Sequence, residues 1–356
     1  MIPYGRQYLD EEDVKAVVET LTSNWLTQGP AVPKFEAALA DYCGAEFGVA
    51  MNSATSALHI ACLALGVGED DLVWTSPNSF VASSNCALYC GASVDFVDID
   101  LQTGNMCMKA LKQKLEHAQN INILPKGVIP VHFAGQPCDM KEIRALSKQY
   151  GFFVIEDASH AVGAKYQEKF VGSCEFSDIC VFSFHPVKII TTMEGGMALT
   201  NNSEWAEKMR MLRSHGITND PEKMTEDSHG PWYYQQIALG FNYRMTDVEA
   251  ALGLSQLKKL PGFLEKRNAL AKHYDNLLSA FSCITPLQQR GDSYSSYHLY
   301  VARVESLTNK YHSDLIKNLR EQGVFAHLHY IPIHMQPYYK KLGFKMGDFP
   351  NAETYY

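Results

Sequence analysis

Two kinds of hydrophobic pattern alternate along the first two-thirds of the chain. Apolar residues three or four positions apart predict amphipathic helices, whereas short unbroken apolar runs predict buried strands. Asp10 is a typical helix N-cap, and one helical face behind it carries Val14, Val17, Val18 and Leu21. Further helices are expected at residues 56–65, before Gly66, and from Asp139 to Gly151. Strands are expected at residues 72–75, 127–133, 152–155, 179–184 and 197–200. The alternation predicts an α/β fold.

The pattern changes near Ala251, where a long helical stretch runs to Phe281. Two strand candidates follow it, at residues 297–304 and 324–329. A chain of 356 residues is long enough for one large domain and a smaller one. We therefore expect a large domain at residues 1–250 and a small α+β domain at residues 251–356.

The composition of the chain argues against several classes of function. The net charge of −8 argues against a general nucleic-acid binder, which needs a basic surface. The start of the chain lacks a signal-peptide pattern, and no apolar run approaches the about 20 residues that a membrane span requires. The nine cysteines are scattered without a C-x-x-C pair. We expect free thiols, no metal site and a cytoplasmic protein.

Two early motifs suit a planar ligand that carries a phosphate. Residues 52–56 (NSATS) directly precede a predicted helix, whose N-terminal N–H groups suit a phosphate dianion. Phe80 follows the predicted strand at 72–75, where its ring would stack on a planar group. Taken singly, an ordinary helix cap and a core phenylalanine explain these residues better.

Two later motifs carry groups that are able to react. Asp157 comes just beyond a buried strand, where α/β proteins bind ligands, and it suits a pyridine nitrogen as well as a helix N-cap. His160, taken alone, is more typical of a structural residue. In residues 183–188 (SFHPVK), Ser183 suits a phosphate and Lys188 suits a Schiff base with an aldehyde. The alternative for any single lysine is a solvated surface position.

A fifth motif, residues 240–247 (GFNYRMTD), precedes a predicted helix. Asn242 and Arg244 lie two residues apart, so an extended backbone would project both to one side. The alternative is an ordinary turn before the helix. The five motifs together, in this order, are much less probable by chance than any one of them.

With these motifs the chain resembles the DegT/DnrJ-type nucleotide-sugar aminotransferases, which have fold type I, the aspartate-aminotransferase fold. The resemblance extends from Tyr4 to about Tyr339 and includes SFHPVK, NSATSALH, VHFAG, EDASHA, LGFNYRMTD and SSYHLY. It implies a large domain with a mostly parallel sheet that binds pyridoxal 5′-phosphate (PLP), which converts to pyridoxamine 5′-phosphate during turnover.

The resemblance also implies roles for single residues. Lys188 would be the Schiff-base lysine and proton shuttle, Asp157 would pair with the pyridine nitrogen, and His160 would lie beside the ring hydroxyl. Phe80 would stack on the ring, while Ala54, Thr55 and Ser183 would hold the phosphate. Asn242 would reach the phosphate of a neighbouring subunit, which implies a homodimer with shared sites. The substrate site would include Tyr4, Arg6, Thr27, Gln28, Arg244, His329 and Tyr330.

The reaction that the resemblance implies transfers the amino group of L-glutamate to a UDP-linked 4-keto-6-deoxy sugar. Another 4-keto or 3-keto nucleotide sugar, or a PLP-binding regulator without turnover, stays open. A PLP-dependent sugar dehydratase is disfavoured, because that group replaces the lysine that Lys188 provides here.

Three features depart from the pattern of the family. Met193 stands where a small residue is expected, and Ile189 where proline is common. The chain stops at Tyr356, where the family continues with a Pro-containing segment and a last helix. We expect that the small domain is truncated there or lacks this end.

Overall fold

The computed structural model describes residues 1–304 and 309–356. A seven-stranded sheet forms its centre, with the order β1-β9-β8-β5-β4-β2-β3. Only β9 runs antiparallel to its neighbours; the other adjacent pairs are parallel. The strands are β1 (Phe47–Met51), β2 (Leu72–Thr75), β3 (Ser93–Phe96), β4 (Gly127–Ile129), β5 (Phe153–Asp157), β8 (Ile179–Ser183) and β9 (Gly196–Thr200). The predicted α/β fold with a mostly parallel sheet is confirmed.

Helices cover both faces of this sheet. Along β5, Ile155 points into the core beneath α3 and α4, and its neighbour Val154 points to the opposite core, as strand alternation requires. One face carries α3 (Ala54–Ala64), α4 (Ala82–Tyr89) and α7 (Ser203–Leu212). The other carries α2 (Ala31–Cys43), α5 (Met108–Asn120), α6 (Met140–Tyr150) and the first half of α8 (Asp247–Leu278).

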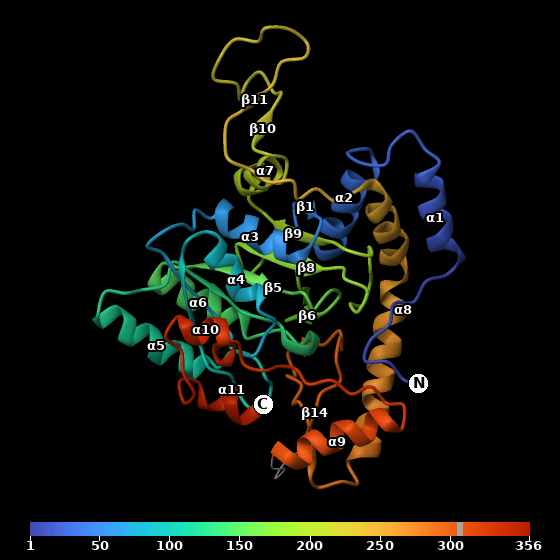
Figure 1. Ribbon diagram of the computed structural model, residues 1–356, viewed down its shortest axis with the longest axis vertical. Coiled ribbons are helices and arrows are strands. Elements are labelled where there is room, and N and C mark those ends of the chain that lie inside the picture. Colours follow the sequence, from blue (N-terminus) through green and yellow to red (C-terminus); the bar gives the residue numbers. More distant parts are fainter. Residues whose placement is uncertain (305–308) are drawn as a thin grey trace.

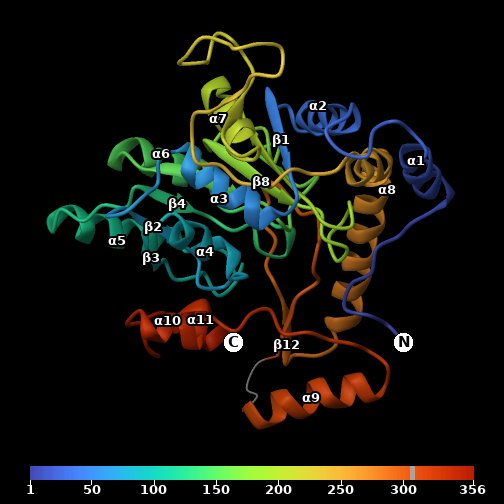
Figure 2. The same cartoon turned by 45° about the horizontal axis from the view of Figure 1, so that its top comes forward.

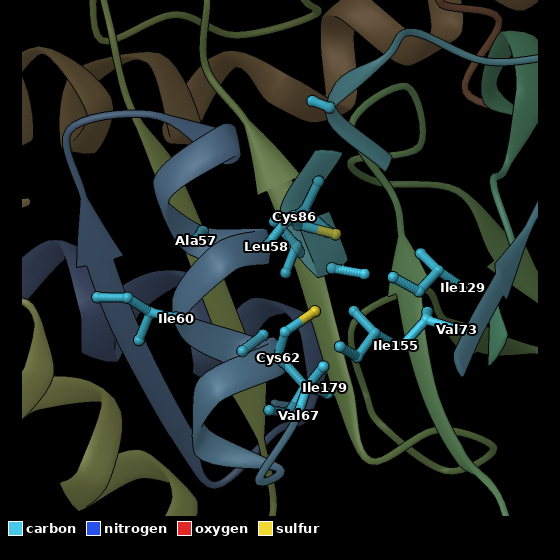
Figure 3. Packing of buried hydrophobic residues seen from close by; sticks show 14 of the residues in the cluster. Ala57, Leu58, Ile60, Cys62, Val67, Val73, Cys86, Ile129, Ile155 and Ile179 are labelled. Carbon is cyan, nitrogen blue, oxygen red and sulfur yellow. The ribbon is translucent and has the colours of Figure 1, made fainter. Parts of the chain in front are cut away.

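The core beneath α3 is closely packed (Figure 3). Leu58 and Cys62 of α3 point toward Cys86 of α4 and toward Ile155 and Ile179 of the sheet, and all five are fully buried. Burying a side chain such as leucine contributes about 1.5–3 kcal/mol. The buried side chains of α3 and α4 therefore hold these two helices against the sheet.

The long helix α8 lies beside α1 (Glu11–Leu21) in both views (Figures 1 and 2). It begins with a capping box between Thr246 and Glu249 and contains Pro261 in its interior. The predicted N-cap of α1 is confirmed, because the Asp10 side chain accepts hydrogen bonds from the first-turn amides. The predicted helices α3 and α6 are also present, and α6 runs from its N-cap Asp139 to Gly151.

Three strand predictions need correction. The run 127–133 forms a strand only to Ile129 and then turns into a short 3-10 helix, η1 (Phe133–Gly135), in which Ala134 has a φ of 59°. The run 324–329 is not a strand: Val324 makes a single bridge to Ile2. In the run 297–304 only β14 (Ala302–Val304) is a strand, and it pairs with β12 (Ile284–Pro286).

The remaining elements surround this body. The strands β10 (Ile217–Thr218) and β11 (Gln235–Gln236) form an arm that projects from it in Figure 1. A small sheet contains β6 (Lys165–Tyr166), β7 (Lys169–Phe170) and β13 (Ser293–Tyr294). Near the C-terminus follow α9 (Asn309–Glu321), η2 (Ile333–Met335), α10 (Pro337–Lys341) and α11 (Pro350–Tyr355).

The last helices return to the large sheet. The amide of Ile333 donates to the Pro77 carbonyl at 2.9 Å, and Asn351 donates to Asp98 at the same distance. The division into residues 1–250 and 251–356 falls within α8, and we retain it as a proposal. Within the described ranges, no helix is both long and apolar enough to span a membrane.

Candidate active site

The predicted site residues lie at one edge of the sheet. Asp157 ends β5, and Ser183 ends the parallel neighbour β8. The loop after β8 carries Lys188, α3 begins with Ala54 after β1, and Phe80 follows β2. Because the carboxyl ends of strands with one direction meet at the same edge, the fold brings these motifs together where α/β proteins bind ligands.

Asp157 is buried and held from several sides. Its Oδ2 accepts a hydrogen bond from the Ser83 hydroxyl at 2.6 Å, and its Oδ1 accepts one from the Ser159 amide at 3.1 Å. Its own backbone N–H donates to the Pro130 carbonyl at 2.9 Å. The carboxylate therefore has a fixed position between β4 and β8.

Lys188 lies in a turn in which its amide donates to the His185 carbonyl at 2.8 Å. Burial lowers the pKa of its amine to about 8, and the charge of Asp157 opposes that shift. At neutral pH a larger share of this amine is neutral than for a solvated lysine. An amine that is easily deprotonated suits both nucleophilic attack and proton transfer.

His160 is buried next to two other side chains. Its Nε2 lies 3.3 Å from the hydroxyl of Tyr330, and its ring centroid lies 4.4 Å from that of His298. Burial, with the nearby charge of Lys188, holds the pKa of His160 well below its usual range. Its Nδ1 has no hydrogen-bond partner within residues 1–304 and 309–356. A neutral imidazole with a free nitrogen is able to bind a polar group of a ligand.

The start of α3 offers backbone N–H groups that suit an anion. Ser53 caps the helix by accepting from the Ser56 amide, and the amides of Ala54 and Thr55 belong to the first turn, which lacks partners within the helix. A Cβ on Gly196 would lie 2.4 Å from the Ala54 nitrogen, so only glycine fits there. Gly196 pairs in register with Ser183, which therefore lies close to this helix start.

Phe80 differs from an ordinary core phenylalanine. Its side chain is 61% exposed although its neighbour Ser79 is buried. An exposed ring at the end of β2 is available for stacking on a planar ligand.

Some of the predicted substrate residues lie close to His160 and Lys188. The Tyr4 hydroxyl is 3.0 Å from His329 Nε2, and the two rings stack with centroids 5.0 Å apart. Tyr330 links this pair to His160. Arg6 is exposed and follows Gly5, whose backbone passes over Val187. Burial lowers the pKa of His329 to about 4, so its imidazole is neutral at pH 7.

The other predicted binding residues form a second group near the starts of α3 and α8. Thr27 pairs with Thr246, and Gln28 has a φ of 54°. Arg244 pairs with Met51 at the end of β1, and the exposed Asn242 lies two residues before it. In the described part of the chain, no hydrogen bond connects this group with Lys188, Asp157 or His160.

Sequence reasoning missed Ser83 and His298. Ser83 follows Ser79 by four residues, a spacing that places both on one side of the helix start beside Phe80. His298 belongs to the SSYHLY motif, but only the structure brings its ring against His160. Met193, which stands where a small residue is expected, has a φ of 73°, a conformation that glycine adopts without strain.

Comparisons with known proteins identify the family of the chain. Residues 7–356 match the DegT/DnrJ/EryC1/StrS aminotransferase family. The chain is 39% identical to the UDP-4-amino-4,6-dideoxy-N-acetyl-beta-L-altrosamine transaminase of Campylobacter jejuni, covering 100% of this chain and 90% of that protein.

Two solved structures are also similar. One is PseC of Helicobacter pylori, an aminotransferase involved in pseudoaminic acid biosynthesis, with a TM-score of 0.91 and 35% identity over 100% of this chain and 91% of the other. The second, from Streptococcus pneumoniae, is assigned as a sugar aminotransferase and is in the PMP form, with a TM-score of 0.90 and 31% identity over 100% and 92%. The predicted family, fold and enzyme class are thus confirmed: the chain belongs to the DegT/DnrJ/EryC1/StrS aminotransferase family.

Proposed function

We propose that this aminotransferase uses PLP to move the amino group of L-glutamate to the C4 ketone of UDP-2-acetamido-2,6-dideoxy-β-L-arabino-hex-4-ulose. The product is UDP-4-amino-4,6-dideoxy-N-acetyl-β-L-altrosamine. The observation that carries the proposal is the Lys188 amine, whose pKa burial lowers to about 8 beside the Asp157 carboxylate. The names of the Campylobacter and Helicobacter relatives support the choice of sugar.

The residues present fit PLP. Lys188 would bond to its aldehyde, and Asp157 would hold a proton on its ring nitrogen. His160 would lie beside the ring hydroxyl; its Nδ1 has no partner among the described residues, and its Nε2 lies 3.3 Å from the Tyr330 hydroxyl. The exposed ring of Phe80 suits stacking. The phosphate would bind at Ala54, Thr55 and Ser183, where Gly196 lets β9 approach the helix start closely. When bound, PLP supplies an electron sink that stabilises negative charge at the amino acid Cα.

The protein side of the reaction follows from two residues. The Asp157 carboxylate would lie beside the ring nitrogen, and the donors at both of its oxygens hold it in one orientation. The Lys188 amine would move a proton from Cα of glutamate to C4′ of the cofactor, and in the reverse half a proton from C4′ to C4 of the sugar. A pKa near 8 suits both tasks at neutral pH, because neither protonation state is rare.

The sugar would bind on the side of Tyr4, Arg6, His329 and Tyr330. Burial raises the pKa of Tyr330, so its hydroxyl stays protonated, and His329 is neutral. His329 and Tyr330 therefore offer uncharged hydrogen-bonding groups, which suit a ketone and hydroxyls. Another 4-keto or 3-keto nucleotide sugar would present similar groups and is the alternative substrate.

We also propose a homodimer with shared sites. Asn242 is exposed and unconnected to the site of its own chain by the described hydrogen bonds, which leaves it free for a second subunit. The arm beside it exposes Trp232 at 74% and Leu239 at 82%, apolar surface that a partner would cover. Thr27, Gln28 and Arg244 would then serve the neighbouring site. The nine free cysteines suit the proposed cytoplasmic location.

The test is incubation with PLP, L-glutamate and a panel of UDP- and dTDP-linked keto sugars, followed by NMR of the products. We expect amination at C4 of the UDP-linked 4-keto sugar, and none with Lys188→Ala. Transfer to a different sugar would replace the substrate proposal. A visible band that does not shift on adding glutamate would instead favour a PLP-binding regulator.

A further inference from the structure

We infer that Ser83 is a positioning residue whose hydroxyl orients the Asp157 carboxylate toward the ring nitrogen of the cofactor, and that Ser79 in turn fixes Ser83. The inference rests on the proposed PLP site. It adds to that site a chain of two hydroxyls on the side of Asp157 away from Lys188's loop, at the start of α4.

The directions of the hydrogen bonds follow from the proton count. A carboxylate only accepts, so the Ser83 hydroxyl donates its single proton to Asp157 Oδ2 at 2.6 Å. The Ser79 oxygen lies 2.6 Å from the Ser83 oxygen, which has no second proton to give, so Ser79 donates to Ser83. The Phe80 carbonyl, at 3.3 Å, is the more distant acceptor for Ser83. Both hydroxyl dipoles therefore point toward the carboxylate.

Water cannot easily replace these donors. Ser83 is 0% exposed, and Ser79 and Asp157 are each 4% exposed. The helix α4 that carries Ser83 is anchored by Cys86, which points into the core beneath α3 (Figure 3). A buried polar group without a partner is costly, so loss of the hydroxyl would let the carboxylate turn toward another donor.

The consequence concerns orientation. With the Ser159 amide at Oδ1 and Ser83 at Oδ2, both oxygens of Asp157 are fixed, and the plane of the carboxylate is set. Each oxygen keeps a further lone pair, which is able to accept from a protonated ring nitrogen. A small rotation of this group would weaken that contact, because hydrogen bonds lose strength steeply with angle.

The test is a double-mutant cycle with Ser83→Ala and Asp157→Asn in the full-length protein. Ser84→Ala is the matched control: it removes a neighbouring buried hydroxyl, which contacts Tyr339 rather than Asp157. Three quantities are measured for each variant: the dissociation constant of PLP from fluorescence quenching, the pH dependence of the bound cofactor's absorption band, and the first-order rate of the band change with glutamate.

We expect Ser83→Ala to slow the glutamate step roughly 10–100-fold, the range typical of residues that orient a functional ligand, and to shift the pH midpoint of the band. In the Asp157→Asn background, Ser83→Ala should slow the glutamate step little further, because Ser83 acts through Asp157. Ser84→Ala should stay within about two-fold of the wild type, since it leaves the hydrogen bonds of Asp157 intact. If Ser83→Ala does not fold, Ser79→Ala should give a smaller, equally non-additive effect.

The inference would be overturned if the rate losses of Ser83→Ala and Asp157→Asn add fully in the double variant. A Ser83→Ala protein with a wild-type rate and a wild-type absorption band would also overturn it. A wild-type protein that takes up no PLP at all would overturn the proposed function itself, so the two failures are distinguishable.

Discussion

Gly196 in β9 lies directly against the backbone of Ala54 at the start of α3. A Cβ at position 196 would lie 2.4 Å from the Ala54 nitrogen and 2.5 Å from the carbonyl carbon of Ser53. Both are backbone atoms, which cannot swing away as a side chain would. The helix start and the sheet therefore approach each other closely only because residue 196 has no side chain.

We predict that Gly196→Ala displaces the first turn of α3. The protein should lose about 1–3 kcal/mol of unfolding free energy, the usual cost of forcing an extra methyl group into a packed site. Phosphate-containing ligands should bind more weakly as well. Urea unfolding and PLP titration measure the two effects.

The matched control is Gly262→Ala in the exposed interior of α8, where a Cβ meets nothing within 4 Å. It should stabilise the protein by about 0.4–1 kcal/mol, because alanine has fewer unfolded conformations than glycine. A Gly196→Ala protein as stable as the wild type, with normal PLP affinity, would contradict the proposed phosphate end.

Lys188→Met should abolish turnover and yet stabilise the protein without PLP. The folded pKa of about 8 lies below the ordinary lysine pKa of 10.5, so the unfolded chain binds the lysine proton more tightly. The variant should thus gain on the order of 1–3 kcal/mol at pH 7. Because wild-type stability recovers as pH rises from about 8 to 10.5, the gain should shrink across that window. A gain that grows with pH in urea melts would show that the lysine is not desolvated.

Asp157→Asn should slow proton abstraction by about 10²–10³, since an amide cannot hold the ring nitrogen protonated. The charge of Asp157 raises the pKa of Lys188, so its loss should lower that pKa below about 8. The pH dependence of the reaction between the cofactor-free protein and PLP reports this second effect. A near-normal rate would mean that Asp157 only caps the following turn.

Subunit complementation tests the proposed shared site. Lys188→Ala and Asn242→Ala chains, each inactive alone, are mixed under conditions in which subunits exchange. In a hybrid dimer one site collects both lesions and the other neither, so about a quarter of all sites should recover. If Asn242 served its own chain, every site would keep one lesion and no activity would return. Asn242→Ala must be folded but impaired for the comparison.

Local signals predicted most elements, because their causes are local. The cap at Asp10 and the glycine stop at Gly151 act within a few residues, and both are present in the structure. The strand predicted at 127–133 is longer than the observed strand, which ends at Ile129. The apolar residues continue past Ile129, but the chain turns at Ala134, whose positive φ has no clear sequence signal. Among residues 1–304 and 309–356, Val324 makes its one bridge to Ile2, a contact that local periodicity cannot reveal.

The sequence predicts the part of the candidate site that lies at the ends of strands. Asp157 and Lys188 follow neighbouring parallel strands, so their meeting follows from topology. The hydroxyl of Ser83 reaches Asp157 across 74 positions of sequence, and His298 reaches His160 from the last third of the chain. Such contacts depend on how elements far apart in the sequence pack together, and a local residue pattern does not reveal that packing.

Pro261 divides α8 into a segment before the proline and a segment after it. A proline inside a helix lacks the N–H that would bond the carbonyl four residues earlier, that of Leu257, and its ring crowds that turn. The segment before it packs on the sheet through Leu257 and Leu260, whereas the segment after Leu264 is mostly exposed. Bending is easiest at such a break. Movement of the second segment of α8 relative to the sheet would therefore change the bend angle at Pro261, while the capped start of the helix stays in place.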